Sequence, residues 1–375
     1  MSIVCADRPD YTWYQFLPKI ELHAHLSGSI SKSTLLRLIH NQAKQYEHND
    51  IEQYNSILSD INHHTFTASQ YSLSDCFIIF QLLHKYVDTL DILYYCTQQV
   101  IQDFHNDNVI YLELRTTPRI FYNKNKQPIN TKQQYIDTVI HAINEYQQSN
   151  ETNRLITVRL LLSIDRTQSL ADAIENVELA HCYMTQFNNI VVGIDFSGNP
   201  TRNQFIDYID AFQLADKYSI PCSIHCGEID NYCDTESILQ YSNTSRIGHG
   251  VCMNNSQFNY VYQHQIPIEI CTTSNIMTCC CTHIQQHPVY ELIRRESPYI
   301  ICTDDCGVFN STLTNEYYNV YQLTELNKLQ IIELTEQAIN YIFDKDIKLR
   351  QQLKESYSQF KILHESSSST ASNHP

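Results

Sequence analysis

Eight short apolar runs recur along this 375-residue chain, and each ends abruptly in polar residues. They are rich in Ile, Val, Leu and Tyr, a composition typical of strands, and helix-compatible segments lie between most of them. This alternation favours parallel βα units, and eight such units predict an α/β fold, a closed (β/α)8 TIM barrel. The predicted strands are residues 19–25, 109–115, 155–165, 190–197, 220–225, 246–249, 267–272 and 299–305.

One long interval interrupts the regular alternation. Residues from about 28 to 108 follow the first predicted strand and contain helical patterns over 31–45 and 73–104. We interpret this interval as a helical insertion that covers the mouth of the barrel, within a single domain spanning residues 1–363. Residues 364–375 form a serine-rich stretch of low complexity, which predicts a disordered tail.

Composition excludes several classes of protein. Hydrophobic residues make up 42% of the chain, too many for a disordered protein, and no apolar stretch is long enough to span a membrane. The 25 basic residues against 41 acidic ones give a net charge of -16 without any basic block, which argues against nucleic-acid binding. The first residues lack the pattern of a secretory signal. We therefore expect a cytosolic monomer with reduced cysteines and with no membrane or nucleic-acid partner.

Clusters of histidine and acidic residues stand at the ends of the predicted strands. His23 and His25 end the first strand, where their alternate positions direct both imidazoles to the same side. This motif alone is weak evidence, because a chain with 17 histidines contains His-x-His by chance. The other clusters, at the ends of the fifth, sixth and eighth strands, are His225 with Glu228, His249, and Asp304 with Asp305.

In a barrel these strand ends surround one opening, so their side chains can converge. Three imidazoles and one carboxylate suit a divalent zinc ion with one position left for water. The predicted ligands are His23, His25, His225 and Asp304. Glu228 is not needed as a ligand and suits a proton shuttle, whereas His249 and Asp305 remain to orient the water and a substrate nitrogen. The alternative, ordinary polar residues at strand ends, does not explain why four clusters coincide.

These motifs resemble the signatures of the adenosine and AMP deaminase family, in the family order. The matching segments are His-x-His-Leu-x-Gly at 23–28, Val-Gly-Ile-Asp-Phe-Ser-Gly at 192–198, His-x-Gly-Glu at 225–228, Gly-His-Gly at 248–250 and Thr-Asp-Asp at 303–305. The resemblance implies a (β/α)8 hydrolase of the amidohydrolase type that holds one zinc ion per subunit and replaces an exocyclic amine of a purine with oxygen. The absence of a lysine at the fourth strand end resembles the one-metal branch of that group.

The resemblance also implies a role for each group in catalysis. Zinc lowers the pKa of a bound water towards about 7, which provides a nucleophile for carbon 6 of the purine. Glu228 would protonate ring nitrogen 1, and His249 would hold or deprotonate the attacking water. Asp304 would serve as metal ligand and water partner, and Asp305 would accept a hydrogen bond at nitrogen 7. The backbone at Gly198 would approach the ring near nitrogen 3.

Two segments bear on whether the substrate carries a phosphate. Adenosine-specific members of the family have an acidic residue after His-x-His-Leu, where this chain has Ser27. A serine hydroxyl can donate to a 5'-phosphate that a carboxylate would repel. The second segment, Thr116-Thr117-Pro118-Arg119, offers two hydroxyls and a guanidinium, which are good phosphate donors. Taken alone, the segment would favour the alternative that Arg119 is a surface arginine on a loop.

Residues 77–84, 116–119 and 302–309 resemble the adenosine deaminase-like subfamily, whose members convert N(6)-methyl-AMP to IMP and methylamine. Ser27 departs from the asparagine associated with this subfamily. The leading hypothesis is thus a zinc-dependent N(6)-methyl-AMP deaminase, with adenosine deaminase and an inactive nucleotide-binding relative as alternatives. The resemblance implies that the nucleotide would contact His25, Ser27, His84, Thr116, Thr117, Pro118, Arg119, Asp165, Gly198, Glu228 and Asp305.

A second group of potential metal ligands is discounted. Cys279, Cys280 and Cys281 are followed by His283 and His287, which superficially resembles zinc-finger spacing. Adjacent cysteines point in different directions, however, and no second cysteine pair has suitable spacing. We therefore expect no structural zinc in this segment.

Overall fold

The computed structural model describes residues 9–43, 73–149, 156–186, 190–241, 243–278, 281, 284–324 and 326–370. At its centre is an eight-stranded parallel sheet in which each strand pairs with the next in the order β1 to β8. The predicted (β/α)8 barrel is therefore confirmed. The strands are β1 Lys19–His25, β2 Val109–Thr116, β3 Thr157–Asp165, β4 Val191–Ser197, β5 Cys222–Cys226, β6 Thr244–His249, β7 Ile268–Ile270 and β8 Tyr299–Ile301.

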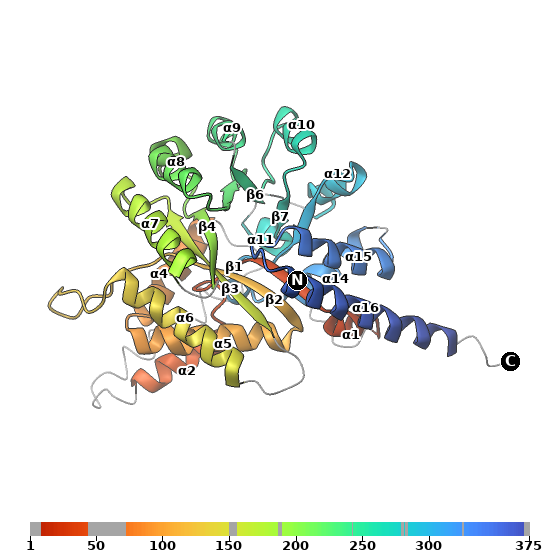
Figure 1. Ribbon diagram of the computed structural model, residues 1–375, viewed down its shortest axis with the longest axis horizontal. Coiled ribbons are helices and arrows are strands. Elements are labelled where there is room, and N and C mark those ends of the chain that lie inside the picture. The colour runs from red at the N-terminus through yellow and green to blue at the C-terminus, as the bar shows by residue number, and fades with distance from the viewer. Residues whose placement is uncertain are drawn as a thin grey trace.

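Helices surround the strands on the outside, as Figure 1 shows. Short 3-10 helices, η2 Phe205–Tyr208, η3 Ile284–Gln286 and η4 Ala338–Asn340, lie between some of them. The α-helices are α1 Pro9–Phe16, α2 Lys32–Ala43, α4 Leu73–Tyr86, α5 Leu90–Asn106, α6 Lys132–Ser149, α7 Leu170–Gln186, α8 Ile209–Lys217, α9 Tyr232–Gln240, α10 Asn255–His264, α11 Thr272–Met277, α12 Val289–Arg294, α13 Cys306–Phe309, α14 Leu313–Leu323, α15 Lys328–Gln337 and α16 Ile347–Thr370.

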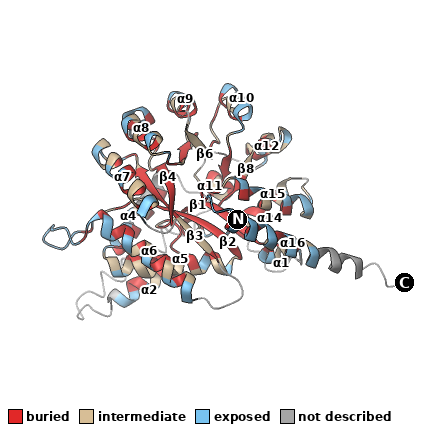
Figure 2. Ribbon diagram, in the orientation of Figure 1, coloured by how far each residue is buried: buried red, intermediate tan, exposed pale blue. Residues whose placement is uncertain are grey.

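The strands form the buried core of the molecule, and Figure 2 shows them as its most buried part. Every residue of β4 and β5 is buried. Burial on both faces is expected for a parallel barrel, whose outer face is covered by helices and whose interior is filled with side chains. This explains why the apolar runs in the sequence are almost continuous, and why the polar residues stand at their ends.

The barrel closes through the chain that follows β8. The backbone N–H of Asp304 donates to the carbonyl oxygen of His23 at 2.8 Å, and the N–H of His25 donates to the carbonyl oxygen of Asp304 at 3.1 Å. These bonds form an isolated parallel bridge between Ala24 and Asp304. The first and last units of the barrel therefore meet at the carboxyl ends of their strands.

The last two strands are shorter than predicted. The sequence analysis extended them over 267–272 and 299–305, but β7 ends at Ile270 and β8 at Ile301. Thr272 already begins helix α11, and Asp304 has a left-handed φ of 63°, which a strand cannot accommodate. The predicted ends of these two strands were wrong because each apolar run continues into polar residues that have already left the strand conformation.

The interval after β1 is helical in the residues that are described. The predicted pattern over 73–104 is two helices, α4 and α5, and the Thr89 side chain caps α5 by accepting from the N–H of Ile92. Helix α4 contributes Cys76, Phe80 and His84 to the lining of the main cavity. Residues 44–72 lie outside the described residues, so the full extent of the cover remains a prediction.

Helix α16 continues to Thr370, whereas the sequence analysis placed the start of a disordered tail at residue 364. Serine carries only a modest penalty inside a helix, so a long helix can extend into a serine run once it has formed. Residues 371–375 lie outside the described residues. Within the described part of the chain, none of the helices combines the length and apolarity that crossing a membrane requires.

Candidate active site

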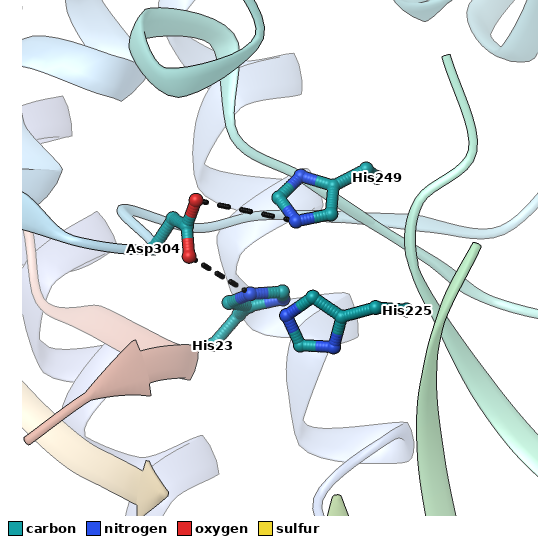
Figure 3. Close-up of side chains that lie close together, drawn as sticks. All are labelled: His23, His225, His249 and Asp304. Carbon is teal, nitrogen blue, oxygen red and sulfur yellow. Dashed lines mark ion pairs between the residues drawn. The ribbon is translucent and has the colours of Figure 1, made fainter. Parts of the chain in front are cut away.

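Four histidines and one aspartate converge at the carboxyl ends of the strands. His23 Nε2 and His25 Nε2 lie 3.2 Å and 3.3 Å from the same oxygen, Asp304 Oδ1. His25 Nε2 is also 3.1 Å from His225 Nε2. Figure 3 shows the rings of His23, His225 and His249 gathered beside the carboxylate of Asp304, and one potential ligand atom from each lies within 4.8 Å of the others.

Two buried carboxylates hold the outer nitrogens of this cluster. Glu269 Oε2 lies 2.7 Å from His23 Nδ1, and Asp195 Oδ1 lies 3.1 Å from His225 Nδ1. Glu269 accepts the Nδ1 proton of His23, which leaves its Nε2 lone pair directed at the centre of the site, and the charge of Asp195 favours a proton on the facing Nδ1 of His225. His23 Nε2 is buried and has no hydrogen-bond partner within the described chain. Imidazoles oriented in this way, together with a carboxylate, fit a divalent metal ion.

Arg115 connects the two orienting carboxylates inside the barrel. Its Nη1 lies 2.9 Å from Asp195 Oδ1, and its Nη2 lies 3.0 Å from Glu269 Oε2. Burial alone would raise the pKa of both acids, but the charge of Arg115 helps to hold each pKa well below its usual range. Arg246 adds a further bond, with its Nε 2.6 Å from Glu269 Oε1. Both carboxylates therefore remain charged and able to orient the histidines.

The sequence analysis did not assign this orienting role to Asp195 or Glu269. Both residues lie within strands, and side chains at alternate strand positions point into the barrel. The available signal was a charged residue inside a short apolar strand, as in Ile-Glu-Ile at 268–270. Such a charge, buried inside a barrel, needs partners of opposite sign or hydrogen-bond donors.

Glu228 and Asp305 are the acidic groups next to the cluster. Glu228 Oε2 lies 3.7 Å from His249 Nε2, and burial raises the pKa of Glu228. Burial, followed by the charges of Asp304 and Glu228, raises the pKa of Asp305 well above its usual range. Burial is thus the largest cause of the raised pKa in both carboxyl groups. Burial also lowers the pKa of His249 to about 4, so its imidazole is neutral at pH 7.

The backbone is strained at two residues of the cluster. His249 and Asp304 have left-handed φ angles of 65° and 63°, which only glycine adopts without cost. Such conformations in other residues cost about 1–3 kcal/mol and persist where the surrounding structure enforces them, often at functional sites. The strain is therefore consistent with selection for the position of these side chains.

The cluster opens into a cavity of about 320 Å³. The lining includes all of the predicted substrate contacts except Pro118, which is buried. The predicted contacts that do line it are His25, Ser27, His84, Thr116, Thr117, Arg119, Asp165, Gly198, Glu228 and Asp305. One concave site thus brings together residues from seven separate parts of the sequence.

Arg119 is held at the cavity by specific contacts. Its Nη2 donates to the carbonyl oxygen of Val87 at 2.8 Å, and its guanidinium lies 5.1 Å from the centre of the Phe121 ring. Thr116 is bonded at 2.8 Å to the hydroxyl of Tyr135, so Thr117 has the more available hydroxyl of the pair. The side chain of Arg119 is therefore fixed against Val87 and Phe121 at the lining of the cavity.

Two glycines are required by close packing at the site. A Cβ at Gly28 would lie 1.6 Å from Asp305 Oδ1, a distance that no side chain tolerates. Gly198 has a φ of 97°, and a Cβ there would lie 2.8 Å from Asp165 Oδ2. Any larger residue at either position would displace a carboxylate that lines the cavity.

Sequence reasoning missed the contribution of the segment after β7. Ser274 Oγ donates to Asp304 Oδ2 at 2.7 Å, and Asn275 Nδ2 lies 3.0 Å from His249 Nδ1. Together with Thr278, both residues line the cavity. The signal that could have found them is a polar Thr-Thr-Ser-Asn stretch at the carboxyl end of a barrel strand, where functional residues gather.

The discounted cysteine segment is only partly described. Cys279, Cys280 and His283 lie outside the described residues, and Cys281 is buried. His287 Nε2 lies 3.0 Å from Asn275 Oδ1, so this histidine is engaged by the segment after β7. Among the described residues, neither Cys281 nor His287 belongs to the metal-binding cluster.

Comparisons with known proteins show the family to which the chain belongs. A profile of the family described as "Adenosine deaminase" matches residues 18–356. The mouse protein named "N6-Methyl-AMP deaminase" is 35% identical over 355 residues, which cover 93% of this chain and 93% of that protein. The crystal structure of the N6-mAMP deaminase of Arabidopsis is 34% identical and superposes with a TM-score of 0.83, covering 93% of this chain and 99% of that one. A structure of the Arabidopsis protein ADAL complexed with IMP is also 34% identical, with a TM-score of 0.82, covering 92% and 98%.

Proposed function

The chain belongs to the adenosine deaminase family and is a hydrolytic deaminase of purine nucleotides. We propose that its substrate is N(6)-methyl-AMP, which it converts to IMP and methylamine, and that its cofactor is zinc. Relatives that are 32–35% identical to this chain, over 93–96% of their own length, are named N6-methyl-AMP or N6-mAMP deaminase. The proposal assigns the same substrate to this chain.

The observation that carries the proposal is the composition of a single cavity. Ser27, Thr117 and Arg119, which are hydrogen-bond donors without negative charge, line it together with four residues of the histidine–aspartate cluster: His25, His225, His249 and Asp304. A hydroxyl and an anchored guanidinium suit a phosphate, whereas an acidic residue at position 27 would repel it. The cavity therefore favours a nucleotide over a nucleoside.

The proposed metal ligands are His23, His25, His225 and Asp304. Three imidazoles and one carboxylate form a donor set that suits zinc and leaves a position for water. When bound, the ion supplies a Lewis acid that lowers the pKa of a water molecule. Glu269 and Asp195 support the set by orienting His23 and His225.

Glu228 is proposed as the proton donor for the reaction. Its carboxyl is buried and burial raises its pKa, which is the direction that a proton donor to ring nitrogen 1 requires. This donation makes carbon 6 electrophilic and allows water to add to it. His249, next to Glu228, orients that water. The water oxygen bonds to carbon 6 and the bond from carbon 6 to the amine nitrogen breaks. Of the two protons of the water, one leaves with methylamine and the other restores Glu228, while IMP keeps the proton on nitrogen 1.

The role of Asp305 differs from the one expected from the sequence. Nitrogen 7 of a purine carries a lone pair and no hydrogen, so Asp305 cannot accept a hydrogen bond there. A protonated carboxyl can donate one. The raised pKa of the buried Asp305 agrees with that form. We therefore propose Asp305 as a donor that holds the base, with Gly198 leaving room at the opposite edge.

A substrate panel tests this proposal. Purified protein is incubated with N(6)-methyl-AMP, N(6)-methyladenosine, AMP and adenosine, and kcat/KM is compared among them. The expected order places N(6)-methyl-AMP first, and faster turnover of either nucleoside would overturn the nucleotide assignment. Arg119→Ala should raise KM for the nucleotide by about 10-fold or more, since hydrogen bonds to charged groups contribute about 1.5–3 kcal/mol. Arg294→Ala, at an exposed arginine on α12, is the matched control.

A further inference from the structure

A line of three buried side chains leads from the cavity into the protein. His249 Nδ1 lies 3.0 Å from Asn275 Nδ2, and Asn275 Oδ1 lies 3.0 Å from His287 Nε2. The three residues are between 1% and 3% exposed. They come from the end of β6, from α11 and from the segment before α12. None of the roles described above accounts for Asn275 or His287.

Which atoms donate and which accept in these hydrogen bonds follows from the contacts of His287, the residue farthest from the cavity in the line. The backbone N–H of Val289 donates to His287 Nδ1 at 3.1 Å. A backbone N–H can only donate, so Nδ1 of His287 is an acceptor and its ring proton must be on Nε2. Burial lowers the pKa of His287 to about 4, in agreement with a neutral ring.

The donors and acceptors of the other two hydrogen bonds then follow one after the other. His287 Nε2 donates, so the atom of Asn275 that faces it must be the amide oxygen. The amide nitrogen consequently faces His249 and donates to its Nδ1. A neutral His249 that accepts at Nδ1 carries its proton on Nε2. That nitrogen points into the site, 3.7 Å from Glu228 Oε2 and 4.0 Å from Asp304 Oδ2.

We infer that Asn275 and His287 are positioning residues that fix the tautomer of His249, so that His249 presents an N–H to the attacking water and does not bind the metal. The contrast with His23 and His225 supports this. Their Nδ1 atoms face carboxylates, which accept a proton, whereas Nδ1 of His249 faces an amide NH2, which donates one. Three similar imidazoles in one cluster, shown in Figure 3, thus receive two different tautomers.

This inference deepens the proposed function and rests on it for its effect on catalysis. Of the two roles open to His249, holding the water or removing its proton, the Nε2–H tautomer selects the first. It also explains how His249 can lie within the ligand cluster without being a ligand. A histidine held in the wrong tautomer can lose orders of magnitude in turnover while the geometry is preserved.

Asn275→Asp is the sharpest test because it changes the hydrogen bonding with almost no change in shape. A carboxylate only accepts, so it would draw the proton of His249 to Nδ1 and expose the Nε2 lone pair. We expect kcat for N(6)-methyl-AMP to fall at least about 10-fold with KM changed less than about 3-fold. Metal should be held at least as tightly as in the wild type, measured by competition with a chelator. An unchanged kcat would overturn the inference.

A second pair of variants covers the case in which Asn275→Asp does not fold. His287→Gln keeps an N–H donor at a similar reach, whereas His287→Leu removes it. Turnover should be largely retained in the first variant and lowered in the second at equal metal content. Equal loss of kcat in both variants would indicate a purely structural role and would contradict the inference.

The tautomer of His249 can be determined without an activity measurement. Protein labelled with 15N-histidine and loaded with metal gives ring-nitrogen shifts that distinguish Nε2–H from Nδ1–H, and His249 is identified by comparison with His249→Asn. We expect Nε2–H in the wild type and a shift to Nδ1–H in Asn275→Asp. Nδ1–H in the wild type would overturn the assignment. If Nε2–H is found but N(6)-methyl-AMP is not turned over, the substrate proposal fails and the tautomer assignment stands.

Discussion

Glu269 Oε2 lies 2.7 Å from His23 Nδ1, and both side chains are completely buried. This contact determines which nitrogen of His23 faces the site. Partners of metal ligands in this position typically contribute 10- to 100-fold to metal affinity.

Glu269→Gln should therefore weaken metal binding by about 10- to 100-fold, because the neutral amide no longer stabilises the Nδ1 proton. Competition with a chelator at pH 7 measures the change. Glu333→Gln, at an exposed position of α15, should leave the affinity unchanged. Equal affinities of the Glu269→Gln variant and the wild type would show that His23 is oriented by packing alone.

Arg115 should be essential for stability. Arg115→Met would leave the carboxylates of Asp195 and Glu269 buried without the cation that bridges them. Removing one partner of a buried ion pair costs about 3–5 kcal/mol. Urea unfolding of the metal-free proteins measures the difference, with Arg294→Met as the exposed control. A loss below 1 kcal/mol, on the order of that expected for a surface pair, would contradict this interpretation.

Glu228→Gln should separate metal binding from turnover. The amide cannot transfer a proton, so kcat should fall by about 10²- to 10⁴-fold while the metal content stays at the wild-type level. His225→Ala is the contrasting variant, since it removes a proposed ligand and should lose the metal. Metal analysis together with kcat distinguishes the two. Loss of metal from Glu228→Gln would count against its role as a proton donor.

Ser27→Asp should reverse the preference for a nucleotide. A second negative charge within about 4 Å of a phosphate costs about 4 kcal/mol at an effective dielectric constant of 20, so kcat/KM for N(6)-methyl-AMP should fall at least 100-fold. N(6)-methyladenosine should be affected much less. Ser27→Asn, which adds no charge, serves as the matched control. Parallel losses on both substrates would place the phosphate elsewhere in the cavity.

The stability of the protein should depend on pH through His287. Its pKa is lowered by burial from 6.5 to about 4, so its contribution to stability is fully present above pH 6.5 and is lost as the pH falls towards 4. A shift of this size corresponds to about 3 kcal/mol. The difference in unfolding free energy between wild type and His287→Gln should therefore shrink by up to that amount between pH 7 and pH 4. A difference that does not vary with pH would show that His287 ionises freely in the folded state.

Much of the fold and the centre of the site could be predicted from the sequence. The apolar runs and the polar residues that end them mark both the strands and the mouth of a barrel, which is why His23, His225 and Asp304 were found. Asp195 and Glu269 were missed as orienting groups because their importance depends on which strand positions face inward, and on the register between neighbouring strands. That information is spread over several strands and is not contained in any one motif.

The inferred role of Asn275 could not be predicted from the sequence for a different reason. His287 stands next to a run of cysteines in the sequence, and that neighbourhood suggested a comparison with zinc-finger spacing. Its actual partner lies on α11, and the hydrogen bond between them depends on how the chain returns after that helix. The proton positions then follow from a single backbone N–H, that of Val289, which no side-chain pattern can reveal.

The backbone bridge that joins Asp304 to the first strand also has a consequence for folding. Asp304 bonds to His23 and His25 through its main chain and faces the same two histidines with its side chain. The contact that closes the barrel is therefore the contact that completes the proposed ligand set, and it joins the first strand to the segment that follows the last strand. Contacts between such distant segments form late because of the chain entropy they cost. Metal binding should thus report on closure of the barrel itself. No fragment that lacks either β1 or β8 can assemble the proposed metal ligands.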